Sequence, residues 1–265
     1  MTAPARLIGS LTSWARFLVG FLLLWGLLAA ASAADSTGRW RLLILGLVIG
    51  AAALVESILY GTPPRRSLRA LGLGRPGGRS LATATATGAL VLLVFPLASA
   101  VTGLPIGLRF DWLWALITTF AFNGVAEELV WRGYAFRRLR EGRPFWAAVW
   151  CTMPLIAITH VPIALRSGPV IGLGAMLVAA VTSLPLSYLF ETGRSTVWAP
   201  AVVHTAIDSF KLFAIPPAAT TTFSLLLIVV SLIVPLLCLA VPRRLLMADT
   251  KAAPAEPSAS ARQEA

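Results

Sequence analysis

The sequence predicts an all-α integral membrane protein, a bundle of about eight transmembrane helices with both termini in the cytoplasm. Of its 265 residues, 57% are hydrophobic and only 12% are charged, and the mean hydropathy is +0.81. Soluble domains carry about 25% charged residues, so this chain has too few to cover a water-soluble particle. The apolar residues also gather in runs that approach or exceed the roughly 20 residues needed to cross a bilayer. We therefore expect the chain to fold in lipid.

Eight apolar runs can be followed along the chain, and each is a candidate span. They cover residues 17–34, 42–60, 81–101, 112–134, 145–165, 169–190, 196–215 and 219–241. The first run ends in Ala31-Ser32-Ala33 and also resembles a cleavable signal peptide, although it exceeds the 7–15 apolar residues usual for such a core. The fourth and fifth runs are joined by Glu141-Gly142-Arg143-Pro144, which predicts a turn with a proline starting the next helix.

The runs divide the chain into three parts. Residues 1–16 are predicted to be a cytoplasmic N-terminus, residues 17–241 a polytopic membrane domain, and residues 242–265 a cytoplasmic tail. From about residue 248 the tail is rich in Pro, Ala and Ser, which predicts disorder. Cys151 and Cys238 lie apart in apolar runs, and this favours small core residues over a disulfide or metal framework.

The basic residues predict the orientation in the membrane. With eight spans, sixteen Lys and Arg residues fall on the side that holds both termini, and four fall on the other side: Arg39, Arg41, Arg109 and Arg166. Cytoplasmic loops accumulate Lys and Arg, so both termini are expected in the cytoplasm. The net charge of +11 is then explained by topology and by contact with anionic lipid. It does not indicate a nucleic-acid partner.

A few ionisable residues lie inside the predicted spans, where each charge costs at least roughly 2.5–3.5 kcal/mol and so needs a partner or a function. They are Glu56, Glu127, Glu128, Arg132, His160, His204, Asp208 and Lys211. Glu56 has no obvious neighbour in the sequence, and we expect it to be a structural hydrogen-bonding residue. The other seven lie on three spans and include both histidines of the chain.

The depths of three of these side chains can be compared. Glu127 and His160 are placed symmetrically about the turn at 141–144, so an antiparallel hairpin brings them to the same height. Glu127 is ten residues from Arg137, and His204 is ten residues from Arg194. At 1.5 Å per residue, both lie about 15 Å below the cytoplasmic charges. A carboxylate and two imidazoles are therefore predicted to meet in the cytoplasmic half of the membrane.

Local spacing predicts two ion pairs. Glu128 and Arg132 are i,i+4 neighbours on a helix and can pair, which leaves Glu127 pointing about 100° away. His204, Asp208 and Lys211 lie on one helical face, where Asp208 and Lys211 can pair. The first pair is either a tolerated buried ion pair or a support for Glu127.

Three motifs occur in order on these spans. Glu127-Glu128-Leu-Val-Trp-Arg132 fits E-E-x-x-x-R, His160 ends a segment similar to F-x-x-x-H, and His204-Thr-Ala-Ile-Asp208 fits H-x-x-x-N/D. Together they resemble the motifs of the CPBP intramembrane proteases, which include type II CAAX prenyl endopeptidases and bacterial Abi proteins. The resemblance covers about residues 112–215, the motif-bearing core. Ile156 replaces the Phe of the second motif, and Asp208 stands where Asn is the alternative.

The resemblance implies hydrolysis of a peptide bond by a water that Glu127 activates as general base. Catalytic roles are implied for Glu127, His160, His204 and Asp208, with the two last stabilising the oxyanion, and supporting roles for Glu128 and Arg132. Asp208 is the unusual member, because a carboxyl group donates a hydrogen bond only when protonated. No cofactor is expected. The alternative is a zinc-dependent protease with Glu127, His160 and His204 as ligands, although no H-E-x-x-H motif is present.

The expected substrate is a peptide or protein at the membrane that is anchored there or carries a lipid. The Ala-, Arg-, Gly- and Leu-rich composition favours a bacterial cell membrane as the location. Two other function classes stay open. A transporter would string polar residues along a path and show repeated halves, and a non-catalytic binding or immunity protein would not depend on Glu127.

Overall fold

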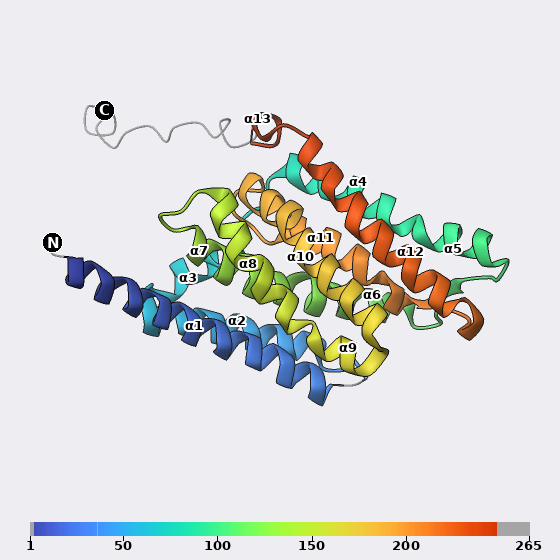
Figure 1. The fold of residues 1–265 in the computed structure, drawn as a ribbon, viewed down its shortest axis with the longest axis horizontal. Coiled ribbons are helices and arrows are strands. Elements are labelled where there is room, and N and C mark those ends of the chain that lie inside the picture. The colour runs from blue at the N-terminus through green and yellow to red at the C-terminus, as the bar shows by residue number, and fades with distance from the viewer. Residues whose placement is uncertain (1–2, 36, 248–265) are drawn as a thin grey trace, which may run out of the picture.

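The computed structural model describes residues 3–35 and 37–247, which form a bundle of long helices (Figure 1). In this part of the chain, seven helices are long and apolar enough to cross a membrane. They are Leu11–Ala34, Arg41–Tyr60, Gly78–Thr102, Trp112–Arg140, Phe145–Ser167, Pro169–Thr192 and Pro217–Ala240. The prediction of an all-α, multi-pass membrane protein is confirmed.

The first three spans precede the motifs. Their elements are α1 (Ala3–Ala34), α2 (Arg41–Tyr60), α3 (Pro64–Ala70), α4 (Gly78–Leu92), α5 (Val94–Thr102) and the short strand β1 (Gly107–Leu108). Helix α2 ends at Gly61, whose φ of 66° is left-handed and suits a residue without a Cβ. Pro63 and Pro64 then start α3.

The fourth span, which we call the rod, is one continuous helical element that contains π-helical turns. It consists of α6 (Trp112–Thr119), the π-helical segments η1 (Phe120–Ala126) and η2 (Leu129–Phe136), and α7 (Arg137–Arg140). Glu127 and Glu128 lie between the two π-helical segments. Such segments are rare and occur frequently at functional sites. The rod continues beyond the predicted end at residue 134 and stops at the predicted turn, where Gly142 has a φ of 71°.

The second half of the chain contains the last three of these spans and, between the second and third of them, a shorter helical segment. Its elements are α8 (Phe145–Thr159), α9 (Val161–Ser167), α10 (Pro169–Thr192), α11 (Trp198–Ile207), the 3₁₀ segment η3 (Asp208–Leu212), strand β2 (Phe213–Ala214), η4 (Pro217–Ala219), α12 (Thr220–Ile233), η5 (Val234–Ala240) and α13 (Arg243–Leu246). The last of these is a helical turn within the predicted tail. The predicted disorder from residue 248 onward lies outside the described residues.

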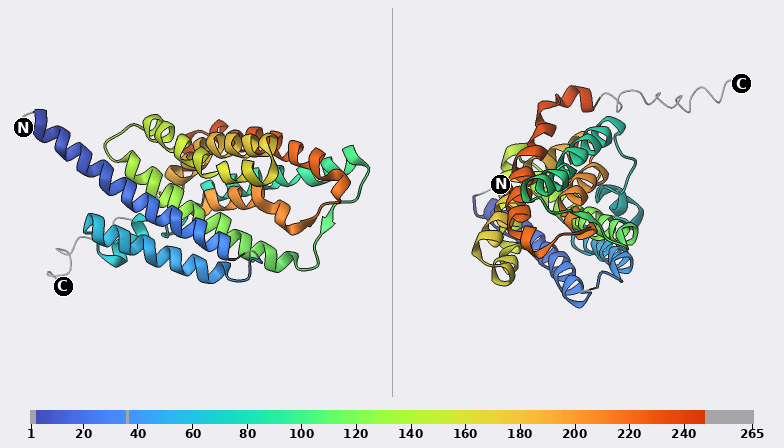
Figure 2. Two further views of the ribbon diagram at one scale, coloured as in Figure 1. Left: turned by 60° about the horizontal axis from the view of Figure 1, so that its bottom comes forward. Right: turned by 90° about the vertical axis from the view of Figure 1, so that its right-hand side faces the viewer.

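The predicted seventh span, 196–215, differs from a full transmembrane helix. Helix α11 has ten residues and the 3₁₀ segment after it has five. The chain then enters β2, which pairs antiparallel with β1 through Gly107 with Ala214 and Leu108 with Phe213. The paired strands supply backbone hydrogen bonds that a continuous helix would otherwise provide. The segment still crosses much of the bundle's length, in the direction opposite to α10 and α12, which precede and follow it in the sequence (Figure 2).

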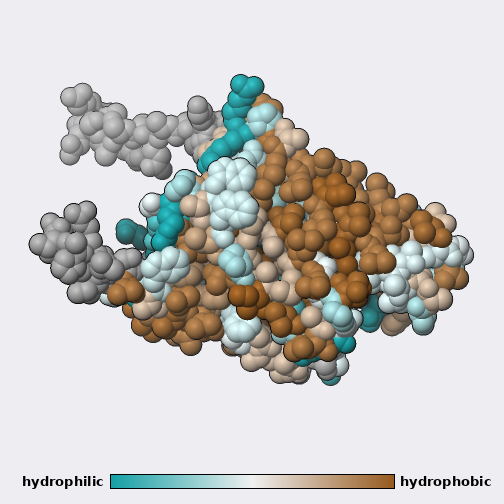
Figure 3. Space-filling view, in the orientation of Figure 1, coloured by the Kyte–Doolittle hydropathy of each residue, from teal (hydrophilic) through white to brown (hydrophobic). Residues whose placement is uncertain are grey.

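The beginning of α1 and helix α13 lie toward the same end of the bundle, together with α3 and α7 (Figure 1). Large apolar side chains such as Leu22, Leu54 and Ile233 are exposed on the surface. Figure 3 shows a broad hydrophobic surface over the helices, with hydrophilic residues gathered toward the end where α13 lies. Such a surface suits lipid.

Candidate active site

The centre of the site is a contact between the fourth span and α11. Glu127 Oε2 lies 3.7 Å from His204 Nε2. The two side chains are 19% and 18% exposed, so both can be reached from outside the protein core. A carboxylate and an imidazole that face each other across a partly accessible space can share a water or a substrate group.

Glu128 lies one residue from Glu127 and is completely buried. Its Oε1 accepts hydrogen bonds from Arg132 Nη1 and from His204 Nδ1, each at 2.7 Å. The predicted pair of Glu128 and Arg132 therefore forms. The same Glu128 oxygen also holds the ring of His204, a contact that neither interpretation of the pair included.

Asn123 is a site residue that the sequence analysis missed. Its Nδ2 donates a hydrogen bond of 2.7 Å to Glu127 Oε1. Its Oδ1 accepts one of 3.0 Å from Lys211 Nζ. Asn123 thus fixes one oxygen of Glu127, and the i,i+4 spacing of Asn123 and Glu127 on a helix was a signal for this contact.

Lys211 and Asp208 form the predicted ion pair on η3. Lys211 has only donors, so the Asp208 oxygen that faces it is an acceptor. The chain of contacts runs from Asp208 through Lys211 and Asn123 to Glu127. Asp208 is thereby linked to Glu127 by side-chain contacts from two spans.

His160 lies at the break between α8 and α9. Pro162 has no backbone N–H to continue the helix, and this explains a break at this position. His160 Nδ1 is 2.9 Å from the carbonyl oxygen of Ile156. A carbonyl only accepts, so Nδ1 carries the hydrogen, and in the neutral ring Nε2 is the acceptor. Within the described residues, the hydrogen bonds of its ring are to its own helix, to Thr159 and to Ile156.

A glycine permits the close approach of the helices that carry Glu127 and His204. A Cβ on Gly124 would lie 2.5 Å from Thr205 Oγ1 and 3.1 Å from the carbonyl oxygen of Ala201. Real side chains do not tolerate such distances, so η1 and α11 can pack this closely only because residue 124 has no side chain.

The described residues include no group of three or more His, Cys, Asp or Glu side chains placed to hold a metal ion. Glu127, His160 and His204 therefore do not form a ready ligand set in this geometry. Cys151 and Cys238 are both free thiols, in keeping with the prediction of isolated core residues.

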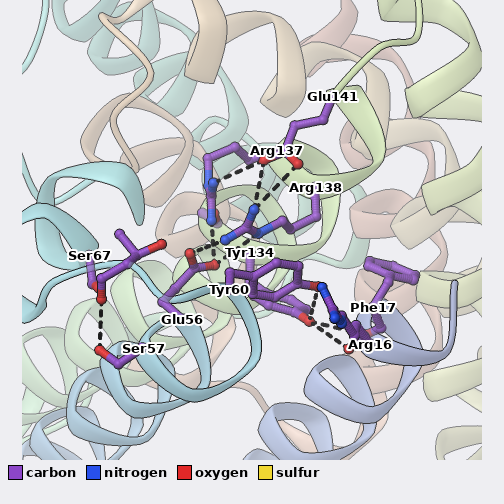
Figure 4. Close-up of polar contacts among 12 residues, drawn as sticks. Arg16, Phe17, Glu56, Ser57, Tyr60, Ser67, Tyr134, Arg137, Arg138 and Glu141 are labelled. Carbon is purple, nitrogen blue, oxygen red and sulfur yellow. Dashed lines mark hydrogen bonds and ion pairs between the residues drawn. The ribbon is translucent and has the colours of Figure 1, made fainter. Parts of the chain in front are cut away.

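Glu56 belongs to a separate cluster at the end of the bundle near α7 (Figure 4). It is completely buried and forms ion pairs with Arg137 and Arg138. The Arg138 guanidinium lies 3.4 Å from the centre of the Tyr60 ring, and the Tyr60 and Tyr134 hydroxyls are 3.1 Å apart. These partners come from the fourth span, so the sequence around Glu56 could not reveal them. The contacts agree with the predicted structural role.

Residues 109–210 match the family model described as type II CAAX prenyl endopeptidase, Rce1-like. The matched range contains all three motifs, from Glu127 to Asp208, and the resemblance seen in the sequence is confirmed. A comparison with curated proteins gives no match. The matched family is one of membrane prenyl endopeptidases, and the match spans the part of the chain that carries the motifs.

Proposed function

We propose that this chain is an intramembrane endopeptidase in which Glu127 activates a water for attack on a peptide bond. The observation that carries the proposal is the placement of Glu127 opposite His204 at 3.7 Å. Two further contacts support it, since Asn123 fixes Glu127 and Glu128 fixes His204. Each reactive group therefore has a partner that sets its orientation, as catalysis requires.

In the proposed reaction, the Glu127 carboxylate takes one proton from the water as the water oxygen bonds to the carbonyl carbon. His160 Nε2 accepts a hydrogen bond from the same water and so orients it. The carbonyl oxygen becomes an oxyanion, to which a protonated His204 donates from Nε2. Glu127 then gives its proton to the amide nitrogen, the C–N bond breaks, and a carboxylic acid and an amine are released.

Asp208 enters this scheme through Lys211. Its acceptor role toward Lys211 makes direct donation to an oxyanion unsuitable, because a donating carboxyl group must be protonated. Lys211 instead carries a positive charge toward the site and holds Asn123. We propose that the main contribution of Asp208 is to hold Lys211 in this position.

The substrate we propose is a membrane-anchored or lipid-bearing polypeptide whose cleaved bond lies near the cytoplasmic face. The proposed depth of the site, about 15 Å below the cytoplasmic charges, suits such a substrate. The proposed location is the cell membrane of a bacterium, and anionic lipids are expected neighbours of the arginine-rich end.

The test is Glu127→Gln in the full chain. Glutamine keeps the shape and the contact with Asn123 but cannot accept the proton, so hydrolysis should fall by roughly 10²–10⁴-fold. Peptide-level proteomics of membranes from cells with wild type or variant identifies the cleaved proteins. Asp111→Asn is the matched control, because Asp111 is exposed and pairs only with Arg109 among the described residues. Unimpaired cleavage by Glu127→Gln would refute the proposal and favour a binding protein.

A second variant, Asp208→Asn, separates the two roles of Asp208. Loss of the ion pair with Lys211 should lower activity at every pH. An oxyanion donor would behave differently, because asparagine always has a donor and would preserve activity over a wider pH range.

The zinc-dependent alternative is tested by stringent chelation of the purified protein, with metal content measured by elemental analysis. Our mechanism expects the full rate without metal. If chelation abolishes activity and added zinc restores it, a metal-bound water takes the place of the water that Glu127 activates.

A further inference from the structure

A cavity of about 560 Å³ opens at the end of the bundle where α3 and α7 lie. Five of its lining residues are arginines: Arg65, Arg66, Arg69, Arg137 and Arg194. Ala70 and Ser195 complete the lining, and no acidic residue takes part. Such a concentration of one charge around a hollow is costly unless an anion neutralises it.

The three arginines of α3 are available to a ligand. Arg65, Arg66 and Arg69 are exposed, and no carboxylate in the described part of the chain pairs with them. Arg137 has acidic partners in Glu56 and Glu141, so its position in the wall is fixed. A guanidinium offers a planar pair of donors that matches the oxygens of a phosphate group.

The walls of the cavity are fastened to one another. The segment after α3 is hydrogen-bonded to the start of α11, through Val197 N to Gly72 O at 3.0 Å and Trp198 Nε1 to Gly74 O at 2.8 Å. The same segment touches the fourth span, where a Cβ on Gly133 would lie 2.3 Å from Leu71 O. The arginines therefore converge from elements whose relative positions are set.

The cavity is separate from the candidate active site. Arg137 is ten residues after Glu127, which is more than two helical turns, and Arg194 is ten residues before His204. The cavity lies at the predicted cytoplasmic end, where the membrane leaflet carries anionic phospholipids and basic pockets between helices bind their headgroups. This location favours a lipid phosphate over the carboxylate of a peptide bound for cleavage.

We propose that the five-arginine cavity binds a phosphate group, supplied by the headgroup of an anionic phospholipid. The bound phosphate neutralises the arginines of α3 and connects the cytoplasmic ends of the two elements that carry Glu127 and His204. This proposal does not rest on the proposed protease activity, because binding is measured directly.

The experiment uses the full chain in lipid nanodiscs of phosphatidylcholine with or without phosphatidylglycerol. Native mass spectrometry after release measures retained phosphatidylglycerol, and thermal unfolding measures its stabilising effect. Arg65→Gln/Arg69→Gln should weaken retention by at least roughly tenfold, since each lost hydrogen bond to a charged group is worth that much. The control Arg75→Gln/Arg244→Gln removes equal charge from exposed arginines outside the cavity lining and should retain lipid as wild type does.

Inorganic phosphate added to phosphatidylcholine discs distinguishes the sources. Stabilisation by phosphatidylglycerol but not by free phosphate supports the lipid headgroup, and equal stabilisation by free phosphate overturns the lipid as source. If both double variants lose phosphatidylglycerol equally, the proposed binding in the cavity is wrong, because general surface charge would then explain the retention. Glu127→Gln is expected to bind phosphatidylglycerol as wild type does, so failure of one proposal leaves the other intact.

Discussion

The chemistry of the two histidines is decided by single atoms. Nδ1 of His204 contacts Glu128 and Nδ1 of His160 contacts a backbone carbonyl. In both rings this leaves Nε2 as the atom that the proposed reaction uses, and in His204 that atom faces Glu127. A hydrogen bond to one imidazole nitrogen sets the role of the other.

Asn123 provides a prediction at this scale. Asn123→Ala removes the donor to Glu127 Oε1 and the acceptor for Lys211, so Glu127 gains rotamer freedom. We expect kcat to fall by roughly tenfold or more with little change in KM, because positioning of the base matters most in the transition state. Steady-state assays measure both constants.

The control for this variant is Thr118→Ala, one turn earlier on the same rod, where the hydroxyl contacts only backbone carbonyls of its own helix. An equal loss of kcat in both variants would show a general effect of the helix. A change confined to KM would contradict a role of Asn123 in positioning the base.

Some of these contacts could be predicted from sequence and some could not. The pairs Glu128–Arg132 and Asp208–Lys211 follow from local spacing on one helix. The bond between Glu128 and His204 joins residues 76 positions apart, and it depends on which faces of two helices meet. Asn123 could not be recognised in the same way as the charged residues, because an amide is not ionisable and is less costly in an apolar span.

At the scale of elements, the close contact of η1 with α11 gives a second prediction. Gly124→Ala puts a methyl group 2.5 Å from Thr205 Oγ1 and 3.1 Å from Ala201 O, so the two elements must separate. Overpacking of this kind costs about 1–3 kcal/mol, and the distance between Glu127 and His204 should increase. We expect lower activity together with a lower unfolding temperature.

Two further variants check this explanation. Thr205→Ala combined with Gly124→Ala removes the nearest atom and should recover part of the lost activity. Gly50→Ala adds a methyl group where no atom lies within 4 Å and should be nearly neutral. If the double variant is no better than Gly124→Ala alone, crowding against Thr205 is not the cause.

The Glu56 cluster gives a third prediction, because it ties α2 to α7. Glu56→Gln leaves Arg137 and Arg138 without their buried counter-charge, and breaking such a pair costs about 3 kcal/mol. Thermal unfolding in detergent should show a clear decrease in stability. Glu141→Gln changes the exposed partner of the same arginines and should alter stability by less than about 1 kcal/mol. Similar effects of the two variants would contradict the importance of the buried pair.

Sequence patterns predicted the positions of the spans better than they predicted the type and length of the helices within each span. Hydropathy marked the spans because lipid-facing positions must be apolar. It could not show that α11 is short, since the apolar residues of 3₁₀ and strand segments count equally in such a pattern. The π-helical turns of the fourth span also leave no mark in composition, because the same apolar residues fit an α-helix.

For the molecule as a whole, the arrangement in the membrane gives a fourth prediction. In a Cys151→Ala/Cys238→Ala background, Glu141→Cys lies at the end near α7 and Ser167→Cys at the opposite end of α8 and α9. Both native side chains are exposed. A membrane-impermeant thiol reagent applied to intact cells should label Ser167→Cys only, and opened cells should allow labelling of both.

The cysteine-free background must first be shown to retain the fold, because Cys238 is buried beside Thr87. Labelling of Glu141→Cys in intact cells would invert the predicted orientation. Labelling of both positions from outside would contradict a membrane-spanning hairpin.

The shortness of α11 has a consequence for the length of chain that a substrate must present. His204 is six residues beyond Trp198, the first residue of α11, or about 9 Å along the axis. That interval is set by the helix, so thicker or thinner bilayers leave it unchanged. In the proposed reaction, the protein then acts as a ruler for a polypeptide anchored near Trp198, and the number of residues between anchor and cut is fixed by helix length.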